Sequence, residues 1–377
     1  MKVLHINNAY SITPLYKYLI AALSKKQLQQ IIYVPIRREN DRNKNIVKFE
    51  TVQYIFSKIH FKIIRPFYFL KTIVIFLDLI TKISIKDIDV VHSHFLMSNG
   101  GVAYLVKLFF RKKYITAVRN TDLFTYLKYQ PYLKFIAYQI LKHADRIVLI
   151  SPAYLYHLKK LFSTKQIEKI INKIDIIPNG VEDYWIQNAA GKSKKPDQTN
   201  LTLIYVGAFN RGKNIENIVK TCFLLREKIN VKLKLIGGGG NNHKKIMHLI
   251  KENSSFISFY GQVRDRDRLA KLFRESDIFI MPSFRETFGL TYIEAMTQGL
   301  PVVYSNYQGL YGYFREGVVG FGVDPFNPSD IKNKVLLILK NYETMSSNVI
   351  KEINSFDWDK IAEKYNHLYC QVFSNAC

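Results

Sequence analysis

Two glutamates eight residues apart, Glu286 and Glu294, are the residues of this chain whose type and spacing first suggest chemistry. They belong to the segment 283–295, where an apolar run typical of a buried strand passes through a turn into a helical run. Two helical turns would separate the two carboxylates by roughly 11–12 Å. Carboxyl groups that together cleave one glycosidic bond lie roughly 5–10 Å apart. The spacing therefore favours binding of a long ligand, although taken alone each residue also fits an ordinary solvated glutamate.

The turn between the expected strand and helix contains Phe288, Gly289, Leu290 and Thr291. At the start of a helix the first backbone N–H groups have no intrahelical partner, and the macrodipole adds partial positive charge. Such a strand, turn and helix start is suited to an anion, and above all to a phosphate. A nucleotide sugar has the matching length, with its diphosphate over the helix start and its sugar and ribose toward the two glutamates.

A second strand, expected at 202–207, ends at Gly207 and leads into a loop with Arg211 and Lys213. In open α/β sheets, ligands bind beyond the carboxyl ends of the strands. There the Lys213 ammonium could bind a diphosphate as a point charge, and the planar Arg211 guanidinium could bind it with two parallel hydrogen bonds. In isolation, an exposed surface lysine is the alternative interpretation of Lys213.

The arrangement E-x7-E, with FGL after the first Glu and EA at the second, resembles the donor site of retaining GT-B glycosyltransferases, in particular glycosyltransferase family 4. The resemblance spans nearly the whole chain and is strongest from 202 to 324. It implies an α/β protein of GT-B architecture, with two Rossmann-like domains facing across a cleft. The implied reaction moves a sugar, with retained configuration, from a UDP- or GDP-sugar to a saccharide or lipid-linked saccharide acceptor. Surface polysaccharide or glycolipid biosynthesis is the implied setting.

The resemblance also implies roles for single residues. Glu286 would bind hydroxyls of the donor sugar near the reacting carbon, and Glu294 would bind the ribose. Around the rest of the donor it places Gly207, Arg211, Lys213, Phe288, Gly289, Leu290 and Thr291. No metal or other cofactor is expected, because a lysine and a helix start take the place of a cation.

In the first half of the chain, the family commonly presents a His and then an Asp after the strand expected at 114–118. Here Arg119 stands at the His position, and Asp122 matches the Asp. An arginine cannot accept a proton but can hold a phosphate or a carboxylate in a fork. Arg119 and Asp122 are therefore catalytic candidates beside Glu286, and a structural pair within the loop is the alternative.

His92 and His94 share one face of a strand expected at 88–94 and could form a metal pair. The sequence shows no third ligand, and no metal is assigned. The family that the chain resembles has a similar strand near its interdomain cleft, which implies that these histidines are structural or acceptor-side residues. The expected domains are 1–190 for the acceptor and 191–355 for the nucleotide sugar, followed by a helix at 356–377 that packs back on the first. A polar stretch at 189–200 is the expected linker.

The chain has 377 residues and a net charge of +25, and residues 1–190 hold 29 Lys/Arg against 12 Asp/Glu. Such a balance suits nucleic acid, an anionic membrane or an anionic substrate. Basic and aromatic residues interleave in 56–71, as at a membrane surface or on an amphipathic helix that faces the core. No apolar run reaches the ~20 residues of a membrane span. No signal peptide or cysteine framework is visible, so we expect a cytoplasmic protein, with peripheral contact at the inner face of the cell membrane as a further partner.

Three other functions fit parts of the sequence. A sugar-nucleotide epimerase could share the architecture, and a glycosidase could use two glutamates, although their spacing is wrong for it. A nonenzymatic nucleic-acid-binding protein fits the charge, but no compact basic recognition element appears, so nucleic acid is not an expected partner.

Overall fold

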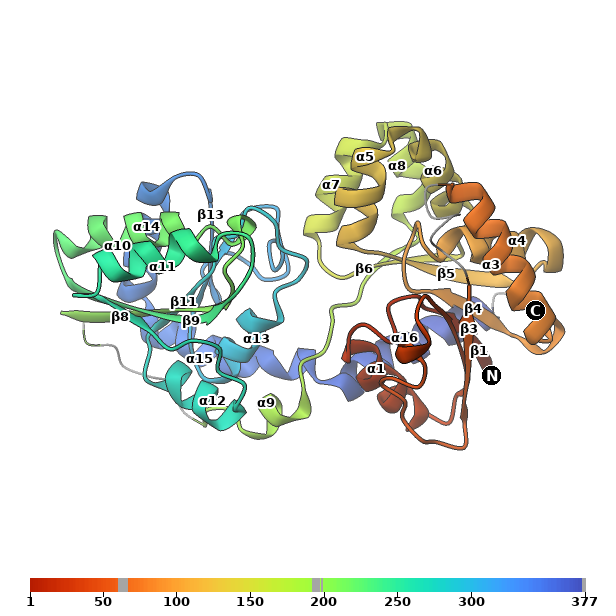
Figure 1. Ribbon diagram of the computed structural model, residues 1–377, viewed down its shortest axis with the longest axis horizontal. Coiled ribbons are helices and arrows are strands. Elements are labelled where there is room, and N and C mark those ends of the chain that lie inside the picture. The colour runs from red at the N-terminus through yellow and green to blue at the C-terminus, as the bar shows by residue number, and fades with distance from the viewer. Residues whose placement is uncertain (60–66, 192–196, 198, 375–377) are drawn as a thin grey trace. The chain divides into compact units, whose positions relative to one another are not determined.

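The computed structural model describes residues 1–59, 67–191, 197 and 199–374, and within it the chain forms two compact units (Figure 1). The first unit comprises Met1–Ile150, Tyr154–Gly180 and Trp358–Cys377. The second comprises Ser151–Ala153 and Val181–Asp357. Each unit is built on its own parallel β-sheet with helices on both faces, which is the doubly wound arrangement expected from the sequence.

The first unit contains a seven-stranded sheet in the order β3-β2-β1-β4-β5-β6-β7. Its strands are β1 (Lys2–Ile6), β2 (Gln29–Ile36), β3 (Val52–Lys58), β4 (Val90–Ser93), β5 (Lys113–Val118), β6 (Arg146–Leu149) and β7 (Ile174–Ile176). All neighbouring strands pair in parallel. Because both faces are covered, a central strand is buried along its whole length and not on one face only: all four residues of β4 are buried.

Helices α1 (Leu15–Ser24) and α16 (Trp358–Ser374) pack together on one face of this sheet (Figure 1). Their apolar sides form one core with the strands, and Trp358 and Tyr369 of α16 belong to it. The other helices of the unit are α3 (Tyr68–Lys82), α4 (Gly100–Phe110), α5 (Leu127–Tyr129), α6 (Lys134–His143), α7 (Ala153–Leu161) and α8 (Thr164–Ile171). The C-terminal helix thus completes the first unit, although it follows the second in the chain.

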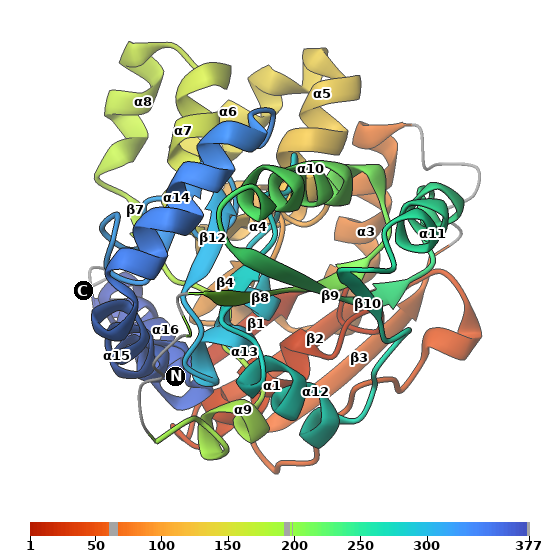
Figure 2. The ribbon, with the colours of Figure 1, turned by 90° about the vertical axis from the view of Figure 1, so that its left-hand side faces the viewer.

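The second unit contains a six-stranded sheet in the order β10-β9-β8-β11-β12-β13. Its strands are β8 (Asn200–Ala208), β9 (Asn230–Gly238), β10 (Ile257–Phe259), β11 (Ile278–Ile280), β12 (Val302–Ser305) and β13 (Gly320–Val323). Its helices are α9 (Asp183–Gln187), α10 (Ile215–Arg226), α11 (His243–Glu252), α12 (Arg266–Arg274), α13 (Leu290–Thr297), α14 (Pro328–Lys340) and α15 (Tyr342–Glu352). Helices α10, α11 and α14 cover one face, and α12 and α13 lie on the other (Figures 1 and 2).

The two units meet in the sequence at Gly180 and Val181, ten residues before the boundary placed at 190. The reason is the short helix α9, whose Trp185 packs edge-on against Phe273 with ring centroids 5.9 Å apart. Beside it, the Tyr184 hydroxyl donates a hydrogen bond of 2.6 Å to Asp267. The expected linker at 189–200 and the aromatic-basic segment 56–71 lie partly outside the described residues. Among the described helices, none combines the length and the apolar character that a bilayer crossing requires.

Candidate functional site

Glycine at position 289 sets the geometry of the turn between β11 and α13. Gly289 caps the helix with φ 80° and ψ 66°, a left-handed conformation that L-residues with a side chain rarely adopt. A Cβ atom at this position would lie 2.4 Å from the ring of Tyr292. That ring is fixed in turn, because the Tyr292 hydroxyl donates to the backbone carbonyl of Met281 at the end of β11. The sequence therefore folds this turn so that the first amides of α13 carry no side-chain cap.

Lys213 and Glu286 form an ion pair in the second unit, with Nζ 2.6 Å from Oε2. The two side chains come from loops after β8 and β11, which are neighbouring parallel strands. Both are largely withdrawn from solvent, with 24% and 10% of the side chains exposed. The structure thus brings together the two residues expected at the diphosphate and at the donor sugar.

Glu286 has further partners that the sequence did not indicate. Its Oε1 accepts a hydrogen bond of 3.0 Å from the Thr287 amide, and its own amide donates to the Gln308 side chain at 3.3 Å. Gly309, at φ 50°, leaves room for it: a Cβ there would lie 3.0 Å from Glu286 Cγ. The loop after β12 therefore supports the glutamate. In the sequence, Gly309 beside Gln308 was the feature that could have indicated this supporting loop.

Near the end of β8, Gly207 is approached closely by Gly237 of β9, because Gly237 has no side chain. A Cβ on Gly237 of β9 would lie 1.9 Å from the Gly207 carbonyl oxygen. The following turn contains Arg211, which is exposed and whose amide donates to Asn241 at 3.0 Å. Arg211 thus stands two residues before Lys213 on the same short turn (Arg211–Lys213).

The turn residues flanking Gly289 divide into a buried and a partly exposed set. The Phe288 side chain is 1% exposed and packs on Phe356, so only its backbone could reach a ligand. Leu290 and Thr291 open α13 and are half-buried. Their amides belong to the first turn, where no intrahelical acceptor exists.

Glu294 is half-buried within α13. Burial raises the pKa of its carboxyl to about 7, the nearby Glu182 adds to that shift, and Arg266 opposes it. Arg266 also forms an ion pair with Glu182. The ionised form of the Glu294 carboxyl is therefore disfavoured at this position.

Replacing Glu294→Gln should stabilise the ligand-free protein at alkaline pH. With a folded pKa near 7 and an unfolded one near 4.5, the native state binds more protons between these values, so stability falls as pH rises through that window. The glutamine variant has no titrating carboxyl at this position, so its stability does not fall in this pH window. We expect its Tm to exceed the wild-type Tm by roughly 2–5 °C at pH 8 and by much less at pH 5. Calorimetry of both proteins at the two pH values measures this, with Glu227→Gln as an exposed control. An equal difference at pH 5 and pH 8 would contradict it.

Asp122 lies in the first unit and is fully buried. Its carboxylate accepts three backbone N–H groups, from Arg119 at 2.8 Å, Leu96 at 3.1 Å and Met97 at 2.9 Å. Burial raises its pKa to about 6, while these hydrogen bonds and the Arg119 charge oppose the shift. The carboxylate thereby fixes the turn after β4 against the turn after β5.

Arg119 is also buried, with 6% exposure. Its Nε donates to the His94 carbonyl at 3.4 Å, and its Nη1 donates to the Asn179 side chain at 3.2 Å. Asp122 hydrogen-bonds the backbone amide of Arg119, so the two residues are neighbours through the main chain. Asn179, in the segment after β7, is a partner whose role the sequence did not indicate.

A pocket opens in the first unit beyond β1 and β2. It is lined by Asn8, Ser11, Ile12, Pro35, Ile36, Arg37, Asp41, Lys71, Ile75, Ser98 and Tyr126. Lys71 is 5% exposed, and its Nζ donates to the Tyr126 hydroxyl at 3.1 Å. The pocket thus combines hydroxyl, amide and cationic groups and the Asp41 carboxylate at the carboxyl ends of strands, where α/β proteins bind ligands.

Comparison with known proteins identifies the family of this chain. Residues 187–354 match the family described as glycosyl transferases group 1, and residues 15–184 match glycosyltransferase family 4. An uncharacterised glycosyltransferase of Methanocaldococcus jannaschii is 26% identical over 75% of this chain and 76% of its own length. The N-acetyl-alpha-D-glucosaminyl L-malate synthase of Bacillus anthracis is 23% identical over 76% of each chain.

Two solved structures share the fold over nearly the whole chain. Sucrose-phosphate synthase from Thermosynechococcus elongatus superposes with a TM-score of 0.73 at 19% identity, covering 100% of both chains. Anabaena HepE in complex with UDP gives a TM-score of 0.70 at 14% identity, covering 98% of this chain and 100% of that one. The fold is GT-B, two Rossmann-like α/β units in one chain. The protein is a glycosyltransferase, and it belongs to glycosyltransferase family 4.

Proposed function

We propose that the protein transfers a sugar from a nucleotide-sugar donor, with retention, to a saccharide or lipid-linked acceptor. The observation that carries the donor assignment is the Lys213–Glu286 pair beside the uncapped start of α13. A cation and free amides are suited to a diphosphate, and a carboxylate is suited to sugar hydroxyls. HepE has been crystallised in complex with UDP and in complex with UDP-glucose, which supports UDP-sugars as the first donors to test.

In this proposal, donor binding rearranges the ion pair. Lys213 turns from Glu286 to the diphosphate, where its charge offsets the negative charge that builds up as the leaving group departs. Glu286 is then released to accept hydrogen bonds from the donor sugar. The amides of Leu290 and Thr291 bind phosphate oxygens, and Glu294 accepts from the ribose. These groups supply the neutralising charge without a metal ion.

A thermal-shift panel of UDP-, GDP-, ADP- and dTDP-sugars on the wild type and on Glu294→Ala tests the donor site. A ligand that binds only the native state raises Tm by mass action. We expect one nucleotide to stabilise the wild type, with the shift lost in Glu294→Ala and kept in the exposed control Glu227→Ala. If no nucleotide raises the wild-type Tm, the donor assignment fails.

For the acceptor, we propose an anionic, lipid-linked molecule, because helix α3 lines the pocket of the first unit with one face and exposes apolar side chains on the other. Its inner face contributes Lys71 and Ile75 to the pocket of the first unit. Its outer face exposes apolar side chains in one stripe: Phe69, Leu70, Ile73 and Leu77 are 47–55% exposed. A lipid could thus lie along the outer face while its anionic head group enters the pocket near Lys71.

The apolar stripe continues onto α4. Leu108 and Phe109 are 55% and 69% exposed, and Phe109 meets Phe76 of α3 with ring centroids 5.5 Å apart. Basic residues follow directly at Arg111–Lys113. An exposed apolar patch bordered by cations is suited to an anionic bilayer, because lipid tails take up the apolar groups and head groups pair with the cations. We propose this α3–α4 face as the membrane-docking surface of a peripheral enzyme.

Flotation with liposomes tests the α3–α4 face. We expect the wild type to float with phosphatidylglycerol vesicles at low salt and to be partly released at high salt, since surface attraction is screened. The double variant Phe69→Ser/Phe109→Ser should stay at the bottom of the gradient. Leu337→Ser, on exposed α14 of the second unit, is the matched control and should float. Equal recovery of the double variant would overturn the assignment, as would a wild type that never floats.

A further inference from the structure

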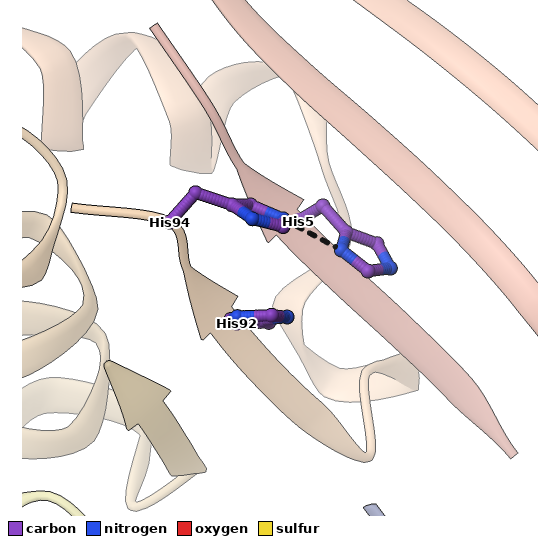
Figure 3. A group of neighbouring side chains, drawn as sticks. All are labelled: His5, His92 and His94. Atoms are coloured by element: carbon purple, nitrogen blue, oxygen red, sulfur yellow. Dashed lines mark hydrogen bonds between the residues drawn. The ribbon is translucent and has the colours of Figure 1, made fainter. Parts of the chain in front are cut away.

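Three histidines form a buried cluster in the first unit. His5 comes from β1, His92 from β4, and His94 stands just after β4 (Figure 3). Each is at most 1% exposed. Strands β1 and β4 are neighbours, and His5 is paired in register with His92. Because of this pairing, the imidazole of His5 lies beside those of His92 and His94.

The cluster has hydrogen-bonding capacity that the surrounding protein leaves unused. His5 Nδ1 and His94 Nε2 share one hydrogen bond of 3.0 Å, drawn in Figure 3. The remaining nitrogens, His5 Nε2 and His94 Nδ1, and also His92 Nε2, are buried and find no hydrogen-bond partner in the described part of the chain. Buried polar atoms are satisfied in the great majority of cases, so an unpartnered nitrogen such as His92 Nε2 calls for a partner that the described chain does not supply.

We propose that His5, His92 and His94 bind a divalent transition-metal ion of the zinc class. One ligand nitrogen from each imidazole lies within 4.8 Å of the other two. Zinc–nitrogen bonds of about 2.0–2.1 Å place tetrahedral ligand atoms roughly 3.4 Å apart. The hydrogen-bonded nitrogens His5 Nδ1 and His94 Nε2 are 3.0 Å apart and so already have about this spacing, and the unpartnered His92 Nε2 would complete the set. A set of neutral imidazoles selects zinc, copper, nickel or cobalt over magnesium and calcium, which prefer oxygen.

Tyr369 of α16 provides the outer contact that histidine ligands commonly have. Its hydroxyl lies 2.7 Å from His92 Nδ1. When Nδ1–H donates to this oxygen, the tautomer is fixed and Nε2 becomes the free ligand atom. The C-terminal helix would thereby orient one ligand of the site, although it lies 277 residues away in the sequence.

Charge near the cluster both favours and opposes a cation. Burial lowers the pKa of His5 to about 3 and holds the pKa values of His92 and His94 well below their ordinary value, because the charged imidazole is desolvated in the core. Arg119 opposes the cation, since its guanidinium contacts the His94 carbonyl. The buried Asp122 carboxylate beside Arg119 offsets part of that charge.

Metal content tests the proposal directly and does not depend on the proposed function, because no nucleotide or sugar is used. The full chain, produced without a polyhistidine tag, is incubated with Zn²⁺, dialysed and analysed by atomic emission. We expect an equimolar amount of zinc in the wild type and a loss of at least tenfold in His5→Phe, which keeps a ring in the core. His248→Ala, which removes an exposed histidine on α11, should retain the metal.

A second measurement on the wild type covers the case in which His5→Phe fails to fold. Co²⁺-loaded protein should show visible d–d absorption of a nitrogen-rich site, which an excess of Zn²⁺ abolishes by displacement. Metal retained by His5→Phe and lost from His248→Ala would identify surface binding and overturn the proposal. A wild type that takes up neither Zn²⁺ nor Co²⁺ would overturn it as well, leaving buried water as the partner of the orphaned nitrogens.

Discussion

Lys213→Met should weaken binding of a nucleoside diphosphate on the order of 10- to 100-fold, because a charge-assisted contact to a phosphate contributes about 1.5–3 kcal/mol. The diphosphate is UDP, or whichever nucleotide stabilises the wild type in the donor panel. Calorimetric titration gives Kd for the diphosphate and for the matching monophosphate. We expect Lys213 to contact the phosphate that carries the donor sugar, which the monophosphate lacks. The variant should therefore lose less affinity for the monophosphate than for the diphosphate. Lys220→Met, exposed on α10, is the matched control.

The ion pair with Glu286 requires a second variant, since Lys213→Met also leaves that carboxylate unpaired at 10% side-chain exposure. In Lys213→Met/Glu286→Gln, both charges are gone. If Lys213 served only to neutralise Glu286, the double variant would regain the wild-type affinity for the diphosphate. We expect no recovery, because the phosphate loses its cation in either background. Recovery to within threefold of the wild type would refute the role of Lys213 at the diphosphate.

The sequence predicts that Lys213 and Glu286 serve one ligand, but their direct pairing depends on sheet order. The two residues are 73 apart in the chain and follow β8 and β11. Apolar runs in the sequence identify each strand, since a parallel strand buried on both faces is hydrophobic along nearly its whole length. They do not state which strands are neighbours. The adjacency of β8 and β11, with their carboxyl ends at the same edge, joins the two loops.

His5 illustrates the same limit in the first unit. His92 and His94 are visible as a pair because alternate residues of one strand share a face. The third imidazole lies 87 residues before His92, on a strand whose register with β4 is fixed only in the folded sheet. A histidine inside the first apolar run was the available signal. It became informative only through the pairing of the two strands.

The burial of Arg119 and Asp122 could not be predicted from the sequence motif. The motif predicts residues that face a reacting sugar. In the structure, the Asp122 carboxylate is saturated with backbone amides from two turns, and the Arg119 guanidinium contacts a carbonyl and an amide side chain. Neither set of partners is readable from a motif, because the amides of Leu96 and Met97 lie 25 or more residues away. We therefore propose that Asp122 positions the loops of the first unit.

Asp122→Ala should destabilise the protein severely, because it leaves three buried N–H groups without an acceptor. Each unsatisfied buried donor costs about 1–3 kcal/mol, so we expect a total loss of roughly 3–5 kcal/mol. For a unit of this size, such a loss lowers Tm by roughly 10 °C. Asp122→Asn retains one carbonyl oxygen and should lose about half as much. Thermal unfolding followed by circular dichroism compares the two variants with Asp87→Ala, an exposed control near β4.

The result also decides what Asp122 does in the reaction. A residue that positions loops should lower Tm and activity together, and Asp122→Asn should recover both in part, since its amide oxygen can still accept from a backbone N–H. A group that touches the donor or acceptor would instead lower activity at an unchanged Tm. The three amides that already occupy the carboxylate favour the first outcome. A Tm for Asp122→Ala within 2 °C of the wild type would mean that water or a backbone shift satisfies those amides, and the positioning role would be lost with it.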